Sequence, residues 1–286
     1  KGMLDQFRRA LPVRYAPPAD YRVDFPTRDS LNAQLTKIGS DLNPKQLEDL
    51  VAATRVPLEE QALPSRQERT LEAYWRDQYE GYETPLLTFA MINRLVECML
   101  RQHAGIRAAL RSTYPFVFLD EFQDTTSAQF ELVRTAFSPE TTRITTVGDD
   151  KQRIMGWAGA MRDGFGTFVE AFGARRVTLL ANWRSHADLV AVQQLVAAHI
   201  DPGAEPVEAR KARSVDGNAC AIWVFADRQA EVETLAHWLA SETGPDGIEP
   251  HAAVLLVRQH ADRVEAELRP SFEAHGLVLR NLARNV

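Results

Sequence analysis

The chain has 286 residues, 45% of them hydrophobic and 25% charged, so it is long enough to bury a core and to form one to three domains. Its longest apolar runs, 116–119 and 252–257, are far too short to cross a bilayer, and no segment near residue 1 has the apolar length of a secretory signal. The formal net charge of −6 argues against a wholly basic nucleic-acid-binding module, but it leaves room for a local basic cleft.

The two cysteines, Cys98 and Cys220, lie far apart on apolar stretches. Two thiols cannot furnish a four-cysteine zinc or iron–sulfur site by themselves. We therefore expect both to be buried as small hydrophobic side chains. Reduced thiols without a membrane segment indicate a cytoplasmic protein.

The first 85 residues predict a small helical subdomain. Asn43-Pro44 has the pattern that opens a helix, and a second helical run follows at 66–82. This part of the sequence has no strand-like alternation of apolar and polar residues.

From residue 86 onward the pattern predicts a layered α/β core. Apolar residues spaced three and four apart over 85–111 indicate a buried helix and a second short one. Helices of this length between strands favour parallel pairing, and the Pro-, Gly- and charge-rich segment 201–218 is the predicted linker between two such cores. The predicted strands are 115–119, 143–147, 176–180, 219–225 and 252–257, and the predicted helices are 127–137, 185–199, 228–241 and 260–275.

Two adjacent carboxylates, Asp120 and Glu121, leave the end of the first predicted strand. Ligands bind at the carboxyl ends of strands in open α/β sheets. Nucleotide hydrolysis needs one carboxylate for Mg²⁺ and another for the attacking water. A solvated acidic loop explains the same two residues, so this strand end alone leaves both interpretations open.

The second strand end carries a neutral amide and an aromatic residue. Gly148 permits a tight exit from the strand, and Gln152 follows where an amide can sense a terminal phosphate. Trp157 stands between glycines, which suits an indole that stacks on a nucleic-acid base. Packing of Trp157 into the core is the alternative.

The third strand end carries Trp183 and Arg184. An arginine here can reach a γ-phosphate, and the tryptophan can cover an adenine ring. Ser185 is the predicted N-cap of the next helix, and a surface arginine beside a capping serine is the bland alternative. The three strand ends follow one another in successive strand–helix units, and together they favour a nucleotide-driven DNA motor.

These segments resemble the UvrD/Rep family of superfamily 1 DNA helicases. DEFQDTT (120–126) looks like motif II of that family, GDDKQRIMGWAGA (148–160) like motif III, and LLANWRS (179–185) like motif IV, while 251–268 resembles the motif that opens the second RecA-like core. The resemblance implies an α/β fold with an incomplete P-loop NTPase, RecA-like parallel sheet core. It assigns 1–85 to a helical insertion subdomain, 86–205 to the remainder of the first RecA-like core, and 206–286 to the start of the second.

The resemblance also implies a role for each matching residue. Asp120 would hold Mg²⁺ and Glu121 would be the catalytic base, while Gln123 and Asp124 would couple the nucleotide site to motif III. Gln152 and Arg184 would bind the γ-phosphate, Trp183 would lie on the adenine, Trp157 would stack on a single-strand base, and Arg258 would approach DNA from the second core. Met155 and Ala158 stand where the family often has Tyr and Arg, which softens two expected DNA contacts.

No glycine of this chain is followed by lysine, so the G-x-x-x-x-G-K-[ST] phosphate loop is absent from it. In the family that loop precedes the helical insertion, so we expect the chain to be the middle of a longer helicase and inactive alone. The parent would be an ATP-dependent 3′ to 5′ DNA helicase that uses ATP and Mg²⁺ on single-stranded and duplex DNA. A degenerate, non-catalytic helicase-like domain that binds DNA or protein is the alternative, and a helicase–nuclease fusion is a third possibility.

Overall fold

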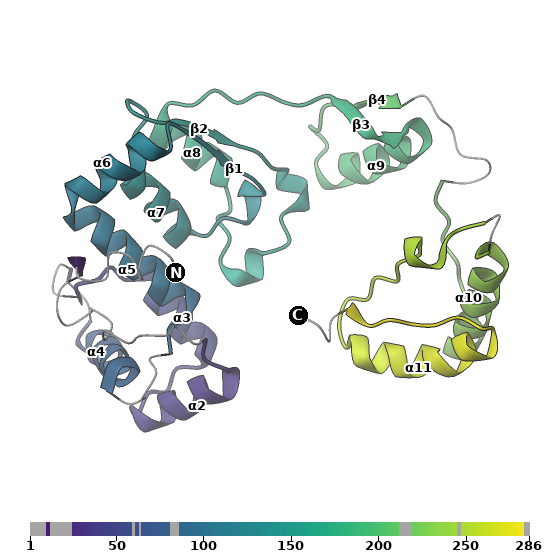
Figure 1. The fold of residues 1–286 in the computed structure, drawn as a ribbon, viewed down its shortest axis with the longest axis horizontal. Coiled ribbons are helices and arrows are strands. Elements are labelled where there is room, and N and C mark those ends of the chain that lie inside the picture. The colour runs from purple at the N-terminus through teal and green to yellow at the C-terminus, as the bar shows by residue number, and fades with distance from the viewer. Residues whose placement is uncertain are drawn as a thin grey trace. The chain divides into compact units, whose positions relative to one another are not determined.

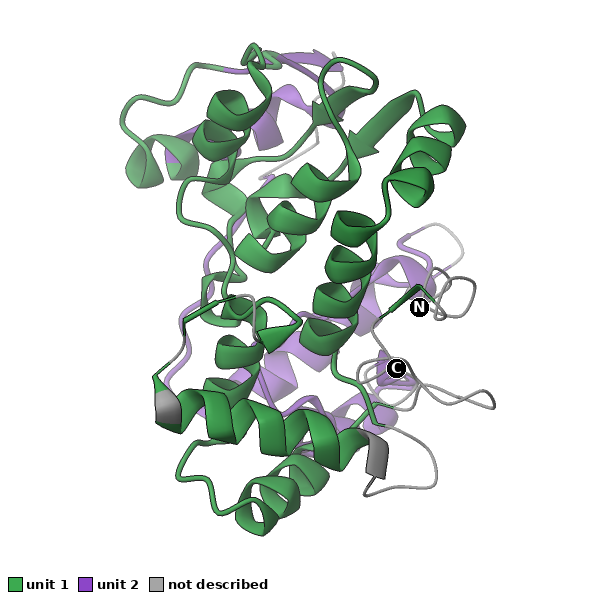
Figure 2. Cartoon of the chain, turned by 90° about the vertical axis from the view of Figure 1, so that its left-hand side faces the viewer, with its two compact units in different colours: residues 1–180, 196–206 green, residues 181–195, 207–286 purple. Residues whose placement is uncertain are grey.

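The computed structural model describes residues 10–11, 25–58, 61–62, 64–80, 86–211, 219–244 and 247–282. The chain forms two compact units, residues 1–180 with 196–206 and residues 181–195 with 207–286 (Figure 2). Within the described ranges, no helix is both long and apolar enough to cross a membrane.

The first unit begins with helices, as the sequence predicts. A capping box between Asn43 and Gln46, with Pro44 at the first helical position, fixes the start of α3. The most buried helix is α5, whose Leu95, Cys98 and Met99 have no exposed surface and lie in the main core with residues of α3 and α4. The helices of this part are α2 (Arg28–Lys37), α3 (Pro44–Ala53), α4 (Ser65–Glu80), α5 (Phe89–Gln102) and α6 (Ala104–Thr113).

An α/β layer follows in the same unit (Figure 1). Strands β1 (Phe116–Leu119) and β2 (Arg143–Thr146) pair in parallel, and α7 (Ser127–Ala136) connects them. The predicted first two strands, their parallel pairing and the crossover helix are therefore confirmed. A core of aromatic residues forms between the sheet, α7 and α8 (Gly164–Phe172), and its buried members are Phe122, Phe130 and Phe168.

The second unit contains β3 (Ala181–His186), β4 (Glu208–Lys211), α10 (Arg228–Glu242) and α11 (Ala261–Ala274), and α9 (Ala187–Ile200) begins in it. Strands β3 and β4 pair in parallel with an irregularity between Asn182 and His186. Helices α10 and α11 pack on one another around a small core made of Val232, Ala236, Leu239, Leu268 and Phe272. The predicted helices 185–199, 228–241 and 260–275 are confirmed, with shifts of one or two residues at their ends.

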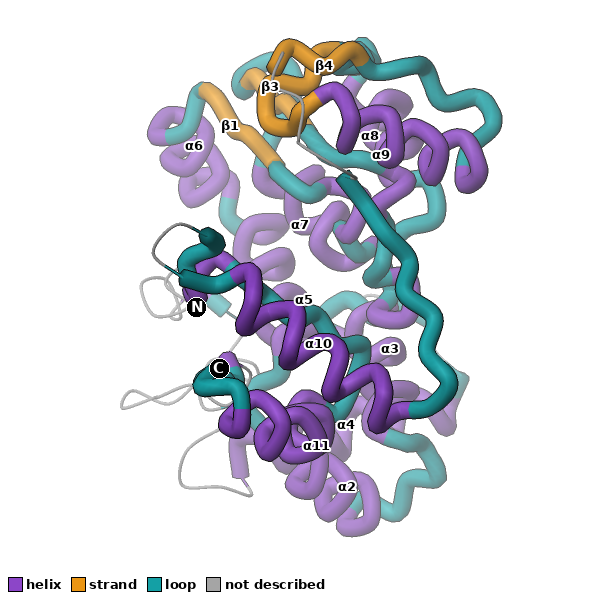
Figure 3. Tube along the Cα trace, turned by 90° about the vertical axis from the view of Figure 1, so that its right-hand side faces the viewer, coloured by secondary structure: helices purple, strands orange, loops and turns teal. Residues whose placement is uncertain are grey.

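Three predicted strands are wrong. Segments 176–180, 219–225 and 252–257 form no strand in the structure (Figure 3), and Leu179, Ile222 and Leu256 within them are 77%, 91% and 92% exposed. An apolar run favours a strand, but the ladder also needs a neighbouring strand to accept its hydrogen bonds. The described part of the chain places no such neighbour beside them.

Three smaller predictions also need correction. Strand β3 runs through Ser185 and α9 begins at Ala187, so Ser185 lies within the strand and is not the N-cap. Strand β4 lies inside the segment predicted to be a linker. Cys98 is buried as expected, whereas Cys220 is exposed because the segment around it joins no sheet.

Candidate functional site

The chain turns sharply where β1 ends. Glu121 has φ 49° and ψ 40°, a left-handed conformation that costs a residue with a side chain about 1–2 kcal/mol. The Glu121 amide donates to Asp120 Oδ1 at 2.9 Å, and both side chains are exposed. A strained turn of this kind persists only where surrounding contacts hold it, and such turns cluster at functional sites.

Gln123 holds the Glu121 side chain at this turn, while backbone bonds from Phe122 to Val147 and from Asp124 to Glu121 hold its main chain. The Gln123 side chain is buried, with 3% of the residue exposed, and its Nε2 donates to Glu121 Oε2 at 2.6 Å. Its Oε1 accepts from the backbone amide of Asp149 at 3.2 Å, just after β2. One buried amide therefore ties the carboxylate after β1 to the turn after β2.

The turn after β2 continues this network. Asp149 caps a short 3₁₀ helix, Asp150–Gln152, and its carboxylate accepts from Gln152 Nε2 at 3.1 Å and from Lys151 Nζ at 2.7 Å. Partial burial raises the pKa of the Asp149 carboxyl, but hydrogen bonds from Lys151 and Gln152 outweigh it and hold that pKa below its ordinary value. Three successive hydrogen bonds thus join Gln152, through Asp149 and Gln123, to Glu121.

Trp157 lies on the loop that follows, in a 3₁₀ turn over Gly156–Ala158. Its side chain is 69% exposed, so it does not pack into the core. Asp124 Oδ1 accepts from the Met155 amide at 3.2 Å, and Lys45 Nζ on α3 donates to the Trp157 carbonyl at 2.6 Å. The loop with the exposed indole is thus fastened to the β1 turn and to the helical part of the first unit.

The other three predicted residues belong to the second unit. Trp183 is 76% exposed on β3, and Arg184 beside it is exposed as well. Asn182 Oδ1 accepts from the amides of Arg184 and Ser185, both at 2.9 Å, which accounts for the irregular pairing of this strand. Arg258 is exposed on the segment before α11. The roles of all three stay predictions.

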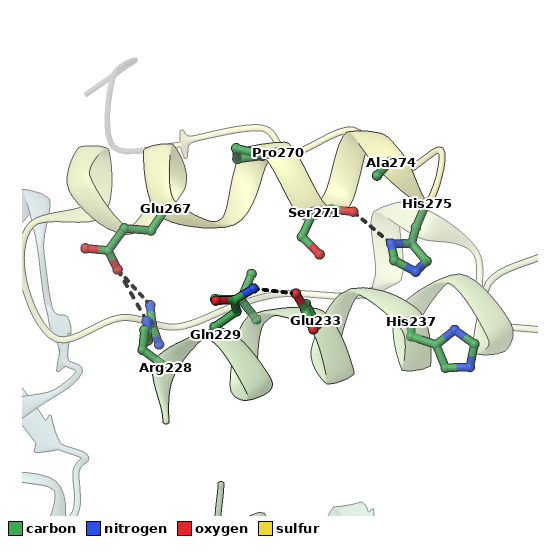
Figure 4. A pocket seen from close by; sticks show the side chains of 10 residues that line it. Arg228, Gln229, Glu233, His237, Glu267, Pro270, Ser271, Ala274 and His275 are labelled. Atoms are coloured by element: carbon green, nitrogen blue, oxygen red, sulfur yellow. Dashed lines mark hydrogen bonds and ion pairs between the residues drawn. The ribbon is translucent and has the colours of Figure 1, made fainter. Parts of the chain in front are cut away.

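A hollow of about 890 Å³ lies between α10 and α11 in the second unit (Figure 4). Its polar side chains pair close by: Arg228 with Glu267 at 3.2 Å, Gln229 with Glu233 at 2.9 Å, and His275 Nδ1 with the Ser271 carbonyl at 2.8 Å. None of the residues predicted from the sequence is among those that line it.

Asp120 and Glu121 place two exposed carboxylates after β1, and carboxylate oxygens are ligands that a magnesium ion accepts. Among the described residues no group of three or more His, Cys, Asp or Glu side chains is placed to hold a metal. Mg²⁺ needs no such cage, since it keeps several waters and takes one or two carboxylates beside phosphate oxygens. The exposed oxygens of Asp120 and Glu121 meet that requirement.

Comparison with known proteins identifies the family. Residues 23–173, more than half of the chain, match the model of the UvrD/REP helicase N-terminal domain. The chain belongs to the UvrD/Rep helicase family. DNA helicase II of Salmonella typhimurium is 30% identical over 127 residues, which make up 42% of this chain and 17% of that protein. ATP-dependent DNA helicase Rep of Escherichia coli is 29% identical over 115 residues, 40% of this chain and 17% of Rep. The RecBCD enzyme subunit RecB of Mycolicibacterium smegmatis is 32% identical over 102 residues, 35% of this chain and 9% of that subunit.

The matched part of this UvrD/Rep chain is thus a small fraction of each relative's length. Within it, the sequence pointed to Gln123, Asp124 and Gly148 but missed Asp149 and Lys45, which complete the network. The amide of Asp149 and the tight packing at Gly148 depend on how two strand ends meet, and Lys45 lies 112 residues from its partner. Gly148, directly after β2, is the residue whose type indicates in the sequence that two segments pack tightly here.

Proposed function

We propose that this chain is a segment of an ATP-dependent DNA helicase that couples ATP hydrolysis to 3′ to 5′ movement on single-stranded DNA. The supporting observation is the Gln123 bridge, because it joins the carboxylate of Glu121 to the turn that carries Gln152. Family membership supports the same reaction class.

Each residue has a distinct task in this proposal. Asp120 would hold Mg²⁺, which when bound would supply positive charge beside the phosphates. Glu121 orients the attacking water and takes its proton, an effect worth about 10²–10⁴ in rate. Gln123 keeps the Glu121 carboxylate aimed by donating to Oε2. Gln152 and Arg184 meet the γ-phosphate, and Trp183 lies on the adenine.

The DNA contacts follow from the loop after β2. Trp157 presents an exposed indole on which a base of single-stranded DNA stacks, and Arg258 contacts DNA from the second core. Asp124 transmits changes between the nucleotide site and this loop, since it accepts from the Met155 amide. Residues 1–85 are the helical insertion, 86–205 the remainder of the first RecA-like core and 206–286 the start of the second.

These 286 residues contain no phosphate loop, so we expect the chain alone to hydrolyse ATP negligibly. The same absence is what favours the alternative, a non-catalytic helicase-like domain that binds DNA or protein. The two proposals differ in whether the gene product that contains this segment hydrolyses ATP.

The test is the substitution Glu121→Gln in that gene product. We expect ATP turnover stimulated by single-stranded DNA to fall by about 10²–10⁴ while DNA binding is retained. Glu140→Gln, an equally conservative change at an exposed position after α7, is the matched control and should leave turnover intact. Equal turnover in the two variants would contradict the role proposed for Glu121, and an absence of turnover in the unsubstituted protein would favour the non-catalytic alternative.

A further inference from the structure

The hydrogen bond between Lys45 and the Trp157 carbonyl joins two parts of the first unit that no sequence motif connects. Lys45 is the second residue of α3, in the helical part, and Trp157 lies on the loop after β2. The distance from Nζ to the carbonyl oxygen is 2.6 Å, which is short for a bond from an ammonium group. Among the described residues, it is the contact that reaches this carbonyl from outside the loop.

Each end of this bond belongs to a segment whose backbone is fixed by other features of the fold. The start of α3 is fixed by its capping box, and Leu47 and Val51 anchor the helix because both are almost fully buried. The lysine backbone therefore cannot shift without disturbing the core. On the other side, Gly159 has φ 89°, so the loop ends in a left-handed turn that only glycine adopts without strain.

Among the described residues, the loop is also attached to the segment after β1, by a bridge between Thr126 and Ala160 and by two hydrogen bonds near its ends. The Met155 amide donates to Asp124 Oδ1 at 3.2 Å, and the Met161 amide donates to the Thr125 carbonyl at 2.9 Å. These bonds hold the two ends of the loop. Lys45 holds its middle, at the residue whose side chain is 69% exposed.

We propose that Lys45 is a positioning residue that fixes the Trp157 loop, so that the helical part of the first unit sets how the indole is presented to a DNA base. This inference rests on the proposed function for its consequence in DNA binding. The part of the inference that Lys45 fixes the loop does not rest on the proposed function, because it can be measured on the chain without DNA. It assigns no contact between Lys45 and DNA.

The first experiment is hydrogen exchange on the full chain without DNA. Lys45→Met removes the ammonium group and keeps the apolar stem, so we expect amides over 155–161 to exchange faster, whereas Lys45→Arg restores a donor and slows them again. Lys211→Met, at an exposed lysine of β4, removes the same charge elsewhere and should leave these amides unchanged. Unchanged exchange in Lys45→Met would overturn the proposal whatever the chain does with DNA.

The second experiment measures the binding of an oligothymidylate by the full chain. Trp157→Ala should weaken it by about 5- to 150-fold, the range for one base stacked on an aromatic ring. Lys45→Met should weaken it by about 3- to 10-fold, as for one lost hydrogen bond, but should have no further effect in the Trp157→Ala background. Additive effects would mean that Lys45 acts independently of Trp157 and would overturn the proposal.

Salt dependence separates positioning from direct contact. A lysine bound to a phosphate contributes about 0.7 to the slope of log K against log salt on a single strand. We expect the slope to be the same in Lys45→Met and the unsubstituted chain, and a slope reduced by that amount would contradict a positioning role. If Trp157→Ala itself leaves binding unchanged, the proposed DNA contact fails, while the exchange experiment still decides whether Lys45 holds the loop.

Discussion

At the scale of single residues, Gly148 lies where the Gln123 amide leaves no room for a side chain. A Cβ atom at position 148 would stand 2.1 Å from Gln123 Oε1, 3.0 Å from the Phe122 amide nitrogen and 3.1 Å from the ring of Phe165. No real Cβ makes the first of these contacts, so a side chain here has to push the Gln123 amide away. The glycine is therefore a condition for the bridge between Glu121 and Asp149.

We expect Gly148→Ala to lower the free energy of unfolding by about 1–3 kcal/mol, because the added methyl group displaces the Gln123 amide and crowds Phe122 and Phe165. The cost should be smaller in a Gln123→Ala background, because the closest clashing atom is then gone. Urea denaturation of the full chain measures both. Gly105→Ala on α6 is the matched control, since a Cβ there meets nothing within 4 Å and the change should be neutral or stabilising. Equal losses at positions 105 and 148 would contradict this account.

The sequence allowed part of this site to be predicted. The pair Asp120 and Glu121 could be recognised because two further strand ends and the family resemblance point to the same chemistry, and the resemblance also singled out Gln123 and Asp124. The structure shows a buried amide and a carboxylate that bond to the next loop, while their functional roles stay predictions. Lys45 could not be predicted, since its partner is a backbone carbonyl, which carries no signature in the sequence.

At the scale of elements, α5 links the helical part of the first unit to α7. The guanidinium of Arg94, whose side chain is 3% exposed, donates to Glu131 of α7 at 2.5 Å and to the Ala52 carbonyl of α3. One turn further on, the buried Glu97 accepts from Thr135 of α7 at 3.2 Å. Since α7 starts directly after the motif II turn, these bonds connect α3 to the segment that carries Glu121.

The two partners of the Arg94–Glu131 pair should respond unequally to substitution. Glu131→Leu leaves a buried, unpaired guanidinium and should cost about 3–5 kcal/mol, towards the lower end because the Glu131 side chain is 34% exposed. Arg94→Met should cost less, since Glu131 keeps solvent and Arg55 at 3.8 Å. The double variant should recover most of the larger loss in urea denaturation. Additive losses in the double variant would show that the pair is not coupled.

Helices and strands could be predicted where the sequence carries a local pattern, such as a capping box, and where the pairing segment lies close by in the sequence. Helix α3 carries its own capping box, and β1 and β2 are joined by a single crossover helix, so pattern and structure agree. The predicted strands 219–225 and 252–257 carry the same kind of apolar run as β1. They form no strand because hydrogen-bond pairing is not a property of one segment, and sequence alone does not supply its partner.

At the scale of the whole molecule, the two units contain separate hydrophobic cores of very different size. The core of the helical part of the first unit includes Leu95 among many buried residues from α2 to α5, and an aromatic core adds to it. Among the described residues, the core of the second unit has five buried members, of which Phe272 is 2% exposed. Because stability depends on buried apolar area, the second unit should be the weaker one.

We therefore expect two thermal transitions in calorimetry of the full chain, the lower one from the second unit. Phe272→Ala removes a large part of the small core at a cost of about 3–5 kcal/mol, so it should abolish or strongly lower the first transition and leave the second in place. Leu95→Ala costs about 2–5 kcal/mol and should lower the second transition. Trp223 and Trp238 lie in the second unit with their ring centroids 5.1 Å apart. Their fluorescence should change in the first transition. A single transition lowered by both substitutions would show that the cores unfold together, because only a cooperative chain transmits a local loss to every part of the fold.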